Sequence, residues 1–218
     1  MMWALRLHRL IAAGAEGPSF WPWMMSGPNG HVGRLVRAFY DYNHLNRVMR
    51  AGEVVREDIG CTAGSYGADV GRTIPVSGFF DAGQRETWNM LIDAYRAGLA
   101  AMKAKVTIAD VMAASRARIA ELQPGLRTEQ AQNAARSLLS DRGMGLWSIH
   151  GVGIDSGETP LDVLQAGSVI AFEPMFSAGA DAFYLEDMIL VTESGHEVLS
   201  AGLPYAAEEI EAVMAQGR

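Results

Sequence analysis

The chain has 218 residues, 49% of them hydrophobic and 20% charged, which is enough for one globular domain with a sizeable core. Its formal net charge of −7 at pH 7 argues against nucleic acid as the main partner, because phosphate binding needs clustered Lys and Arg. The single cysteine excludes an intrachain disulfide, and the sequence has no apolar run of about 18 residues that would suit a transmembrane helix. We therefore expect a cytoplasmic protein with no membrane partner.

The first half of the chain predicts a short helix, a loop and a pair of strands. Residues 4–14 have the apolar spacing of a short helix, and residues 14–33 are rich in Gly, Pro and Trp and contain several turn signals. Residues 53–76 predict two strands separated by a turn at residues 64–67.

Three helices are predicted next. Residues 84–103 carry apolar side chains at three- and four-residue spacing. A second helix is predicted at residues 107–122, where Thr107 and Asp110 form an approximate capping box. A third is predicted at residues 128–140.

The last third of the chain predicts strands at residues 146–153, 168–176 and 184–191, a hairpin turn at 193–195, and a closing helix at 205–216. Strands mixed with helices that are grouped between them indicate an α+β fold with an antiparallel-rich sheet. We expect residues 1–218 to form one domain.

Acidic residues inside apolar strands are the first functional signal. Asp58 and Asp69 both lie in extended apolar segments, where a lone buried carboxylate is costly unless it is paired or binds a metal. His150 stands among apolar residues near Gly151 and Gly153, and glycines let a ligand approach the backbone closely. Taken singly, each residue has an ordinary interpretation, as an edge or turn residue or as a hydrogen-bonded core histidine.

Two glutamates extend this set. Glu173 closes an apolar strand, and Glu186 and Asp187 point to opposite faces of another, so at least one of that pair is expected to face inward. Together the two Asp, one His and two Glu offer oxygen ligands and one imidazole, which suit two ions such as Mn²⁺, Co²⁺, Fe²⁺ or Zn²⁺. Two ions about 3.5–4 Å apart can share carboxylates and a bridging water.

These residues occur in short motifs whose order resembles that of one metallopeptidase family. The motifs are Asp58-Ile59-Gly60, Tyr66-Gly67-Ala68-Asp69-Val70-Gly71-Arg72-Thr73, His150-Gly151-Val152-Gly153, Phe172-Glu173-Pro174 and Leu185-Glu186-Asp187. Over residues 52–199, the chain resembles the family that contains methionine aminopeptidase, aminopeptidase P, prolidase and creatinase. Within that family it is most similar to the prolidase and Xaa-Pro aminopeptidase branch.

The resemblance implies the pita-bread form of the α+β fold, a curved antiparallel-rich sheet flanked by helices. It implies two divalent metal ions, with Mn favoured over Co, Zn or Fe, and hydrolysis of Xaa-Pro peptides by a water that the ions activate. The implied metal ligands are Asp58, Asp69, His150, Glu173 and Glu186, and Glu173 is also the implied catalytic proton carrier. We further expect that the N-terminal domain of longer relatives is absent, and that the apolar edge thereby exposed favours a homodimer.

The chain departs from the family pattern on the substrate side. A second histidine, usual seven positions after the metal-binding one, is here Gly157, although the acidic Glu158 that follows it is retained. The histidine expected four positions before His150 is Leu146, and the arginine expected two positions before the last glutamate is Tyr184. We assign Gly157, Glu158 and Tyr184 to the substrate-binding surface.

A further catalytic histidine is expected near Asp41, and His44 is our choice for it, with His31 as the other nearby candidate. These departures leave two alternatives open. The same metal site could hydrolyse phosphotriesters or activated esters instead of peptides, or the domain could be a non-catalytic binding module of the same fold.

Overall fold

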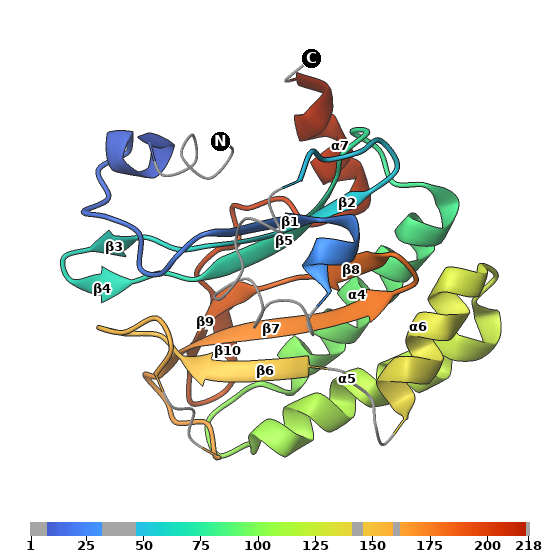
Figure 1. Cartoon of the computed structure of the whole chain (residues 1–218). Helices are drawn as coiled ribbons and strands as arrows, with labels where there is room; N and C mark the ends of the chain where they lie inside the picture. The colour runs from blue at the N-terminus through green and yellow to red at the C-terminus, as the bar shows by residue number, and fades with distance from the viewer. Residues whose placement is uncertain (1–7, 32–46, 141–145, 159–161, 217–218) are drawn as a thin grey trace.

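A computed structural model of the chain describes residues 8–31, 47–140, 146–158 and 162–216 (Figure 1). The strands are β1 (Trp23–Ser26), β2 (Val54–Ile59), β3 (Thr62–Ala63), β4 (Tyr66–Gly67), β5 (Val70–Pro75), β6 (Leu146–Gly151), β7 (Val169–Ala178), β8 (Asp181–Tyr184), β9 (Asp187–Val191) and β10 (His196–Val198). The helices are α4 (Ala82–Ala101), α5 (Ile108–Leu122), α6 (Glu129–Leu139) and α7 (Ala207–Gln216), and the 3-10 turns are η1 (Gly27–Gly30) and η2 (Gln123–Gly125). Within the described residues, neighbouring strands pair in antiparallel orientation. The mixture of such strands with helices confirms the α+β class.

Two sheets meet at the centre of the molecule. The smaller has the order β1-β2-β5, and the larger has the order β10-β9-β7-β6 with β8 beside β7. The sheets join at Gly71 of β5, whose backbone exchanges hydrogen bonds of 3.2 and 2.9 Å with Glu186. Because Asp58 of β2 is the register partner of Gly71, Asp58, Gly71 and Glu186 form one row across the junction.

Helices cover the larger sheet. Figure 1 shows α4, α5 and α6 grouped beside this sheet, whereas α7 lies by the smaller one. The inward side of α4 buries Trp88, Leu91 and Tyr95 completely, and the Tyr95 ring stacks on Phe172 of β7 with 5.2 Å between ring centres. Each large apolar side chain buried in this way contributes about 1.5–3 kcal/mol, so the core holds β7 and its Glu173 firmly in place.

The predicted helices at residues 84–103, 107–122 and 128–140 are confirmed as α4, α5 and α6. The capping box at Thr107 is present, since the Thr107 hydroxyl accepts the Asp110 N–H at 3.0 Å. Residues 8–12 of the predicted first helix are helical. Within the described ranges, no helix has both the length and the apolar sequence needed to cross a membrane.

The single strand predicted for residues 184–191 is wrong. β8 ends at Tyr184 and β9 begins at Asp187, because the backbone of Glu186 leaves the larger sheet to pair with Gly71 of the smaller one. The Leu185 N–H meanwhile donates to the Pro174 carbonyl at 3.1 Å. This break is what brings the Glu186 side chain to the junction of the two sheets.

Candidate metal centre

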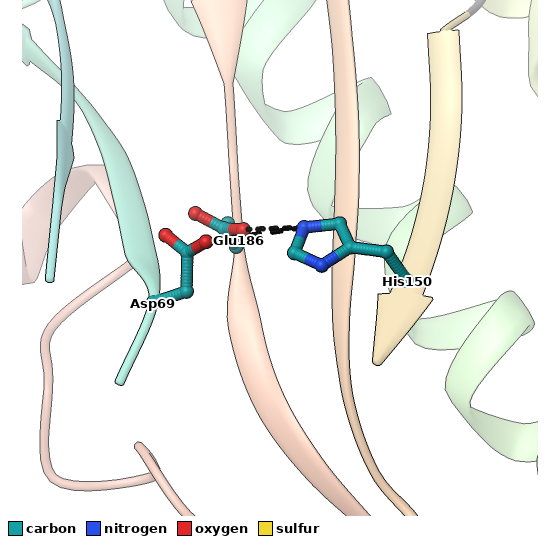
Figure 2. A group of neighbouring side chains, drawn as sticks. All are labelled: Asp69, His150 and Glu186. Atoms are coloured by element: carbon teal, nitrogen blue, oxygen red, sulfur yellow. Dashed lines mark ion pairs between the residues drawn. The ribbon is translucent and has the colours of Figure 1, made fainter. Parts of the chain in front are cut away.

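Three side chains from separate strands converge at the junction. Asp69 immediately precedes β5, His150 lies on β6, and Glu186 lies between β8 and β9. Their ligand atoms all lie within 4.8 Å of one another, and Figure 2 shows them pointing toward a common point. The His150 Nε2 atom is 3.9 Å from Asp69 Oδ2 and 3.9 Å from Glu186 Oε1, so the two carboxylates and the imidazole face the same small space.

Glu173 and Tyr184 adjoin this group. Glu173 Oε1 lies 3.4 Å from His150 Nε2, and the Tyr184 hydroxyl lies 2.8 Å from Glu173 Oε2 and 2.6 Å from Glu186 Oε2. A hydroxyl carries one proton and can donate only one hydrogen bond at a time. Both contacts are therefore satisfied together when one of the two carboxyl groups is itself protonated.

Asp58 lies on the other side of the junction, beside a buried arginine. Asp58 of β2 is 8% exposed, and Arg56 Nη2 donates to its Oδ2 at 3.2 Å. The same guanidinium lies over the Tyr184 ring, with 4.3 Å between Arg56 Cζ and the ring centre. The sequence interpretation missed Arg56, although an arginine two positions before Asp58, on the same side of a strand, was a usable signal.

Burial and crowding shift the pKa values of the acidic residues upward. Burial raises the pKa of Asp58 to about 7, and burial with the nearby charge of Asp58 raises the pKa of Asp69 to about 8. Burial and the charge of Asp69 raise the pKa of Glu186 well above its ordinary value. Without a cation, the centre therefore binds protons that a carboxylate in water would release.

His150 and Glu173 are instead both shifted toward their charged forms, the pKa of His150 upward and that of Glu173 downward. Burial works to lower the pKa of His150, but its hydrogen bond with Glu173 and the Gly151 carbonyl outweigh this and raise the pKa to about 9. Burial likewise works to raise the pKa of Glu173, but the hydrogen bonds from His150 and Tyr184 hold that pKa below its ordinary value. Glu173 is thus the carboxylate that stays ionised.

Two buried carboxylate oxygen atoms without a hydrogen-bond partner among the described residues indicate that these residues could bind a metal ion. Asp69 Oδ1 and Glu186 Oε1 are buried, and neither has a hydrogen-bond partner within the part of the chain that the structure describes. Such orphaned acceptors are costly. Two carboxylates with one imidazole suit Mn²⁺, Fe²⁺, Co²⁺ or Zn²⁺, and one ion at their meeting point would satisfy both oxygens. The residues present therefore fit a divalent cation.

Glu186 and Asp187 are both buried, so the expectation that at least one of them faces inward is confirmed. Asp187 takes no part in the centre. Its Oδ1 accepts Arg72 Nη2 at 2.7 Å and its Oδ2 accepts the Tyr95 hydroxyl at 2.7 Å. This network is structural, because it fixes the start of β9 against α4 and β5.

The residues assigned to substrate binding lie in different settings. Gly157 is exposed, and no described heavy atom lies within 4 Å of where its Cβ would be. Glu158 is also exposed and caps the same loop, because its Oε1 accepts the Ile154 N–H at 3.1 Å. Tyr184 is buried, and its hydroxyl is engaged by the glutamates. The substrate role of these three residues stays a prediction, and His44 lies outside the described residues.

Comparison with known proteins gives consistent matches. Residues 2–193 match metallopeptidase family M24. The Xaa-Pro aminopeptidase of Escherichia coli is 29% identical over an alignment of 231 positions, gaps included. The alignment covers 97% of this chain and 50% of that protein. Xaa-Pro aminopeptidase 2 of Streptomyces coelicolor is 33% identical over 190 residues, which cover 77% of this chain and 40% of that protein.

Solved structures agree with these matches. Escherichia coli aminopeptidase P, as a glutamate-to-alanine variant in complex with substrate, superimposes with a TM-score of 0.78 and 25% identity. The match covers 97% of this chain and 51% of that one. The chain thus spans about half, or less, of the length of the relatives it matches.

Proposed function

The chain belongs to metallopeptidase family M24 and has the pita-bread fold, and from this premise we propose that it is a metal-dependent hydrolase of Xaa-Pro peptides. The observation that carries the proposal is the convergence of Asp69, His150 and Glu186 within 4.8 Å, two of them with a buried oxygen atom that has no partner among the described residues. The names of the relatives support the peptide class.

Most of these residues would hold metal, and Glu173 would also move a proton. Asp69, His150 and Glu186, with Glu173 beside them, would hold one ion, and Asp58 would contribute to a second. Manganese is the ion we favour. When bound, such ions lower the pKa of water and polarise a carbonyl group.

Glu173 is the carboxylate best suited to move a proton. Its Oε1 lies 3.4 Å from the His150 Nε2 atom, so it borders the proposed ion site and could accept a proton from an attacking water. It can then return that proton to the amine that leaves as the peptide bond breaks. The Tyr184 hydroxyl, 2.8 Å from Glu173 Oε2, orients this carboxylate.

The test combines metal content with turnover. Full-length protein is purified, analysed for metal, and assayed with added Mn²⁺, Co²⁺ or Zn²⁺ on an Xaa-Pro dipeptide. We expect Glu186→Gln to lose both metal and activity, whereas Glu197→Gln, a matched change at an exposed glutamate, keeps both. Wild-type protein that takes up no divalent ion would overturn the proposal.

A second candidate function is hydrolysis of a phosphotriester or an activated ester at the same centre. It is favoured by Gly157, which leaves open space where the family resemblance leads one to expect an imidazole. Loss of one electrophilic donor typically costs about 10²–10³ in rate, and a substrate with a good leaving group depends less on such a donor. The ratio of phosphotriester to dipeptide turnover by the Mn²⁺ protein decides between the two. Bound metal without turnover of either would favour a non-catalytic module.

A further inference from the structure

Arg56 is a buried cation at the edge of the candidate metal centre. Its side chain is 3% exposed, Nη2 donates to Asp58 Oδ2, and the guanidinium covers the Tyr184 ring. Its Nε and Nη1 atoms are buried and find no hydrogen-bond partner anywhere in the described ranges. The hydrogen bond to Asp58 and the stacking on Tyr184 hold this guanidinium at the edge of the centre.

The two sides of the centre are unequal in what they offer an ion. On one side, Asp69 Oδ1 and Glu186 Oε1 are buried without a described partner, and Asp69 Oδ2 and Glu186 Oε1 each lie 3.9 Å from His150 Nε2. On the other side, Asp58 is no member of that three-residue group in the described structure, and one of its oxygens already accepts a hydrogen bond from Arg56. A cation on the first side finds free ligands, whereas one on the second side must compete with a guanidinium.

The competition is both geometric and electrostatic. A cation at Asp58 must displace Arg56 Nη2 from Oδ2 or share the carboxylate with it, at a 3.2 Å contact in a buried position. Like charges at such short range repel strongly where water is excluded. The guanidinium cannot escape by losing its proton, and its stacking on Tyr184 holds it in place.

We propose that Arg56 makes the centre asymmetric: Asp69, His150 and Glu186 bind a first ion tightly, while the Arg56 guanidinium supplies the positive charge beside Asp58 and weakens binding of a second ion there. This inference rests on the proposed function, because it takes the centre to be a metal site. Arg56 is a positioning residue in this account, since it acts through Asp58 and Tyr184. At limiting metal concentration, the chain then holds one ion and one guanidinium where two ions would otherwise lie.

The experiment titrates metal-free full-length protein with Mn²⁺ alone and counts bound ions by equilibrium dialysis with elemental analysis. We expect one tight ion per chain and a second bound at least ~10-fold more weakly. In Arg56→Met, which removes the charge and keeps an unbranched apolar side chain, the second ion should bind at least ~10-fold more tightly while the first is unchanged. Arg56→Lys should keep the asymmetry, and Arg118→Met, which removes an equally charged but half-exposed side chain, should leave both affinities alone.

If the Arg56 variants do not fold, the measurement on the wild-type protein can still contradict the inference. Electron paramagnetic resonance of the Mn²⁺ protein distinguishes a single ion from a coupled pair. A wild-type chain that binds two ions of equal affinity, or an Arg56→Met variant whose second site is unchanged, would overturn this inference and leave the proposed function standing. A wild-type chain that binds no ion would overturn both.

Discussion

The ring of Tyr184 fills the space that a side chain at position 71 would need. A Cβ at Gly71 would lie 1.8 Å from Tyr184 Cε1, far inside any allowed contact. Gly71 also pairs with Asp58 in register and with Glu186 through the backbone. The glycine therefore sets where the Tyr184 hydroxyl lies, between the two glutamates of the candidate centre.

Gly71→Ala should displace the Tyr184 ring and so disturb the whole centre. We expect the free energy of unfolding to fall by about 1–3 kcal/mol, as overpacked cores typically do, together with weaker Mn²⁺ binding. Thermal unfolding and metal analysis measure the two effects. Gly125→Ala is the control, because a Cβ there would meet nothing within 4 Å in the described structure. Wild-type melting and metal uptake in Gly71→Ala would contradict the packing argument.

Metal-free protein should lose stability as pH rises. The pKa values of Asp58 and Asp69 are raised from 3.8 to about 7 and about 8 in the folded chain. A raised folded pKa gives stability that is fully present below the unfolded value and is lost as pH passes through the folded one. His150, raised from 6.5 to about 9, acts in the same direction. Denaturant unfolding with a chelator present should thus show lower stability at pH 9 than at pH 6.

One control separates this effect from general alkaline destabilisation. Asp69→Asn removes one of the raised carboxyl groups, so its unfolding free energy should depend less steeply on pH. Glu173 opposes the trend only in acid, because its lowered pKa gives stability that is lost as pH falls. An unfolding free energy that is flat or rises between pH 6 and 9 would argue against protonated carboxyls in the folded metal-free chain.

Glu173→Gln should separate proton transfer from metal binding. The amide keeps the size of the side chain and its contact with Tyr184 but cannot accept a proton from water. If the proposed function holds, kcat on an Xaa-Pro dipeptide should fall by about 10²–10⁴, with at least one ion per chain still bound through Asp69, His150 and Glu186. Retained kcat would remove Glu173 from the proton-moving role.

Thr107→Ala should affect stability without touching the centre. The Thr107 side chain caps α5 by accepting the Asp110 N–H, and loss of such a cap costs about 0.5–2 kcal/mol. Chemical unfolding measures this loss, and Thr107→Ser, which restores the hydroxyl, should recover most of it. Metal content is expected to equal that of the wild type in both variants.

The helices were predictable because their signals are local. The spacing of Trp88, Leu91 and Tyr95 indicates the buried side of α4, and Thr107 with Asp110 marks the start of α5. The acidic residues and His150 were also recognisable from local sequence. Burying a charged group inside an apolar strand is costly unless it is paired or binds a metal. The structure brings three of these residues together, while their roles as ligands remain predictions, as do the homodimer and the cellular compartment.

The remaining features depend on contacts between distant segments. The break between β8 and β9 exists because Glu186 pairs with Gly71 of another sheet. The pattern of apolar and polar residues near residue 186 does not predict that pairing. The stacking of Arg56 on Tyr184 is likewise a meeting of two strands far apart in sequence. Such contacts follow from topology, which a local pattern of apolar and polar residues does not specify.

The backbone link between Gly71 and Glu186 has a consequence for how the molecule opens. The side chains that would hold an ion come from both sheets, Asp69 from beside β5 and His150 from β6, so neither sheet can separate without releasing it. Amide hydrogens of β5 and β9 should then exchange with solvent as one cooperative unit when the ion is bound, and as separate units when it is removed. The ion would thereby serve as a reversible cross-link, in a chain whose single cysteine cannot form one within itself.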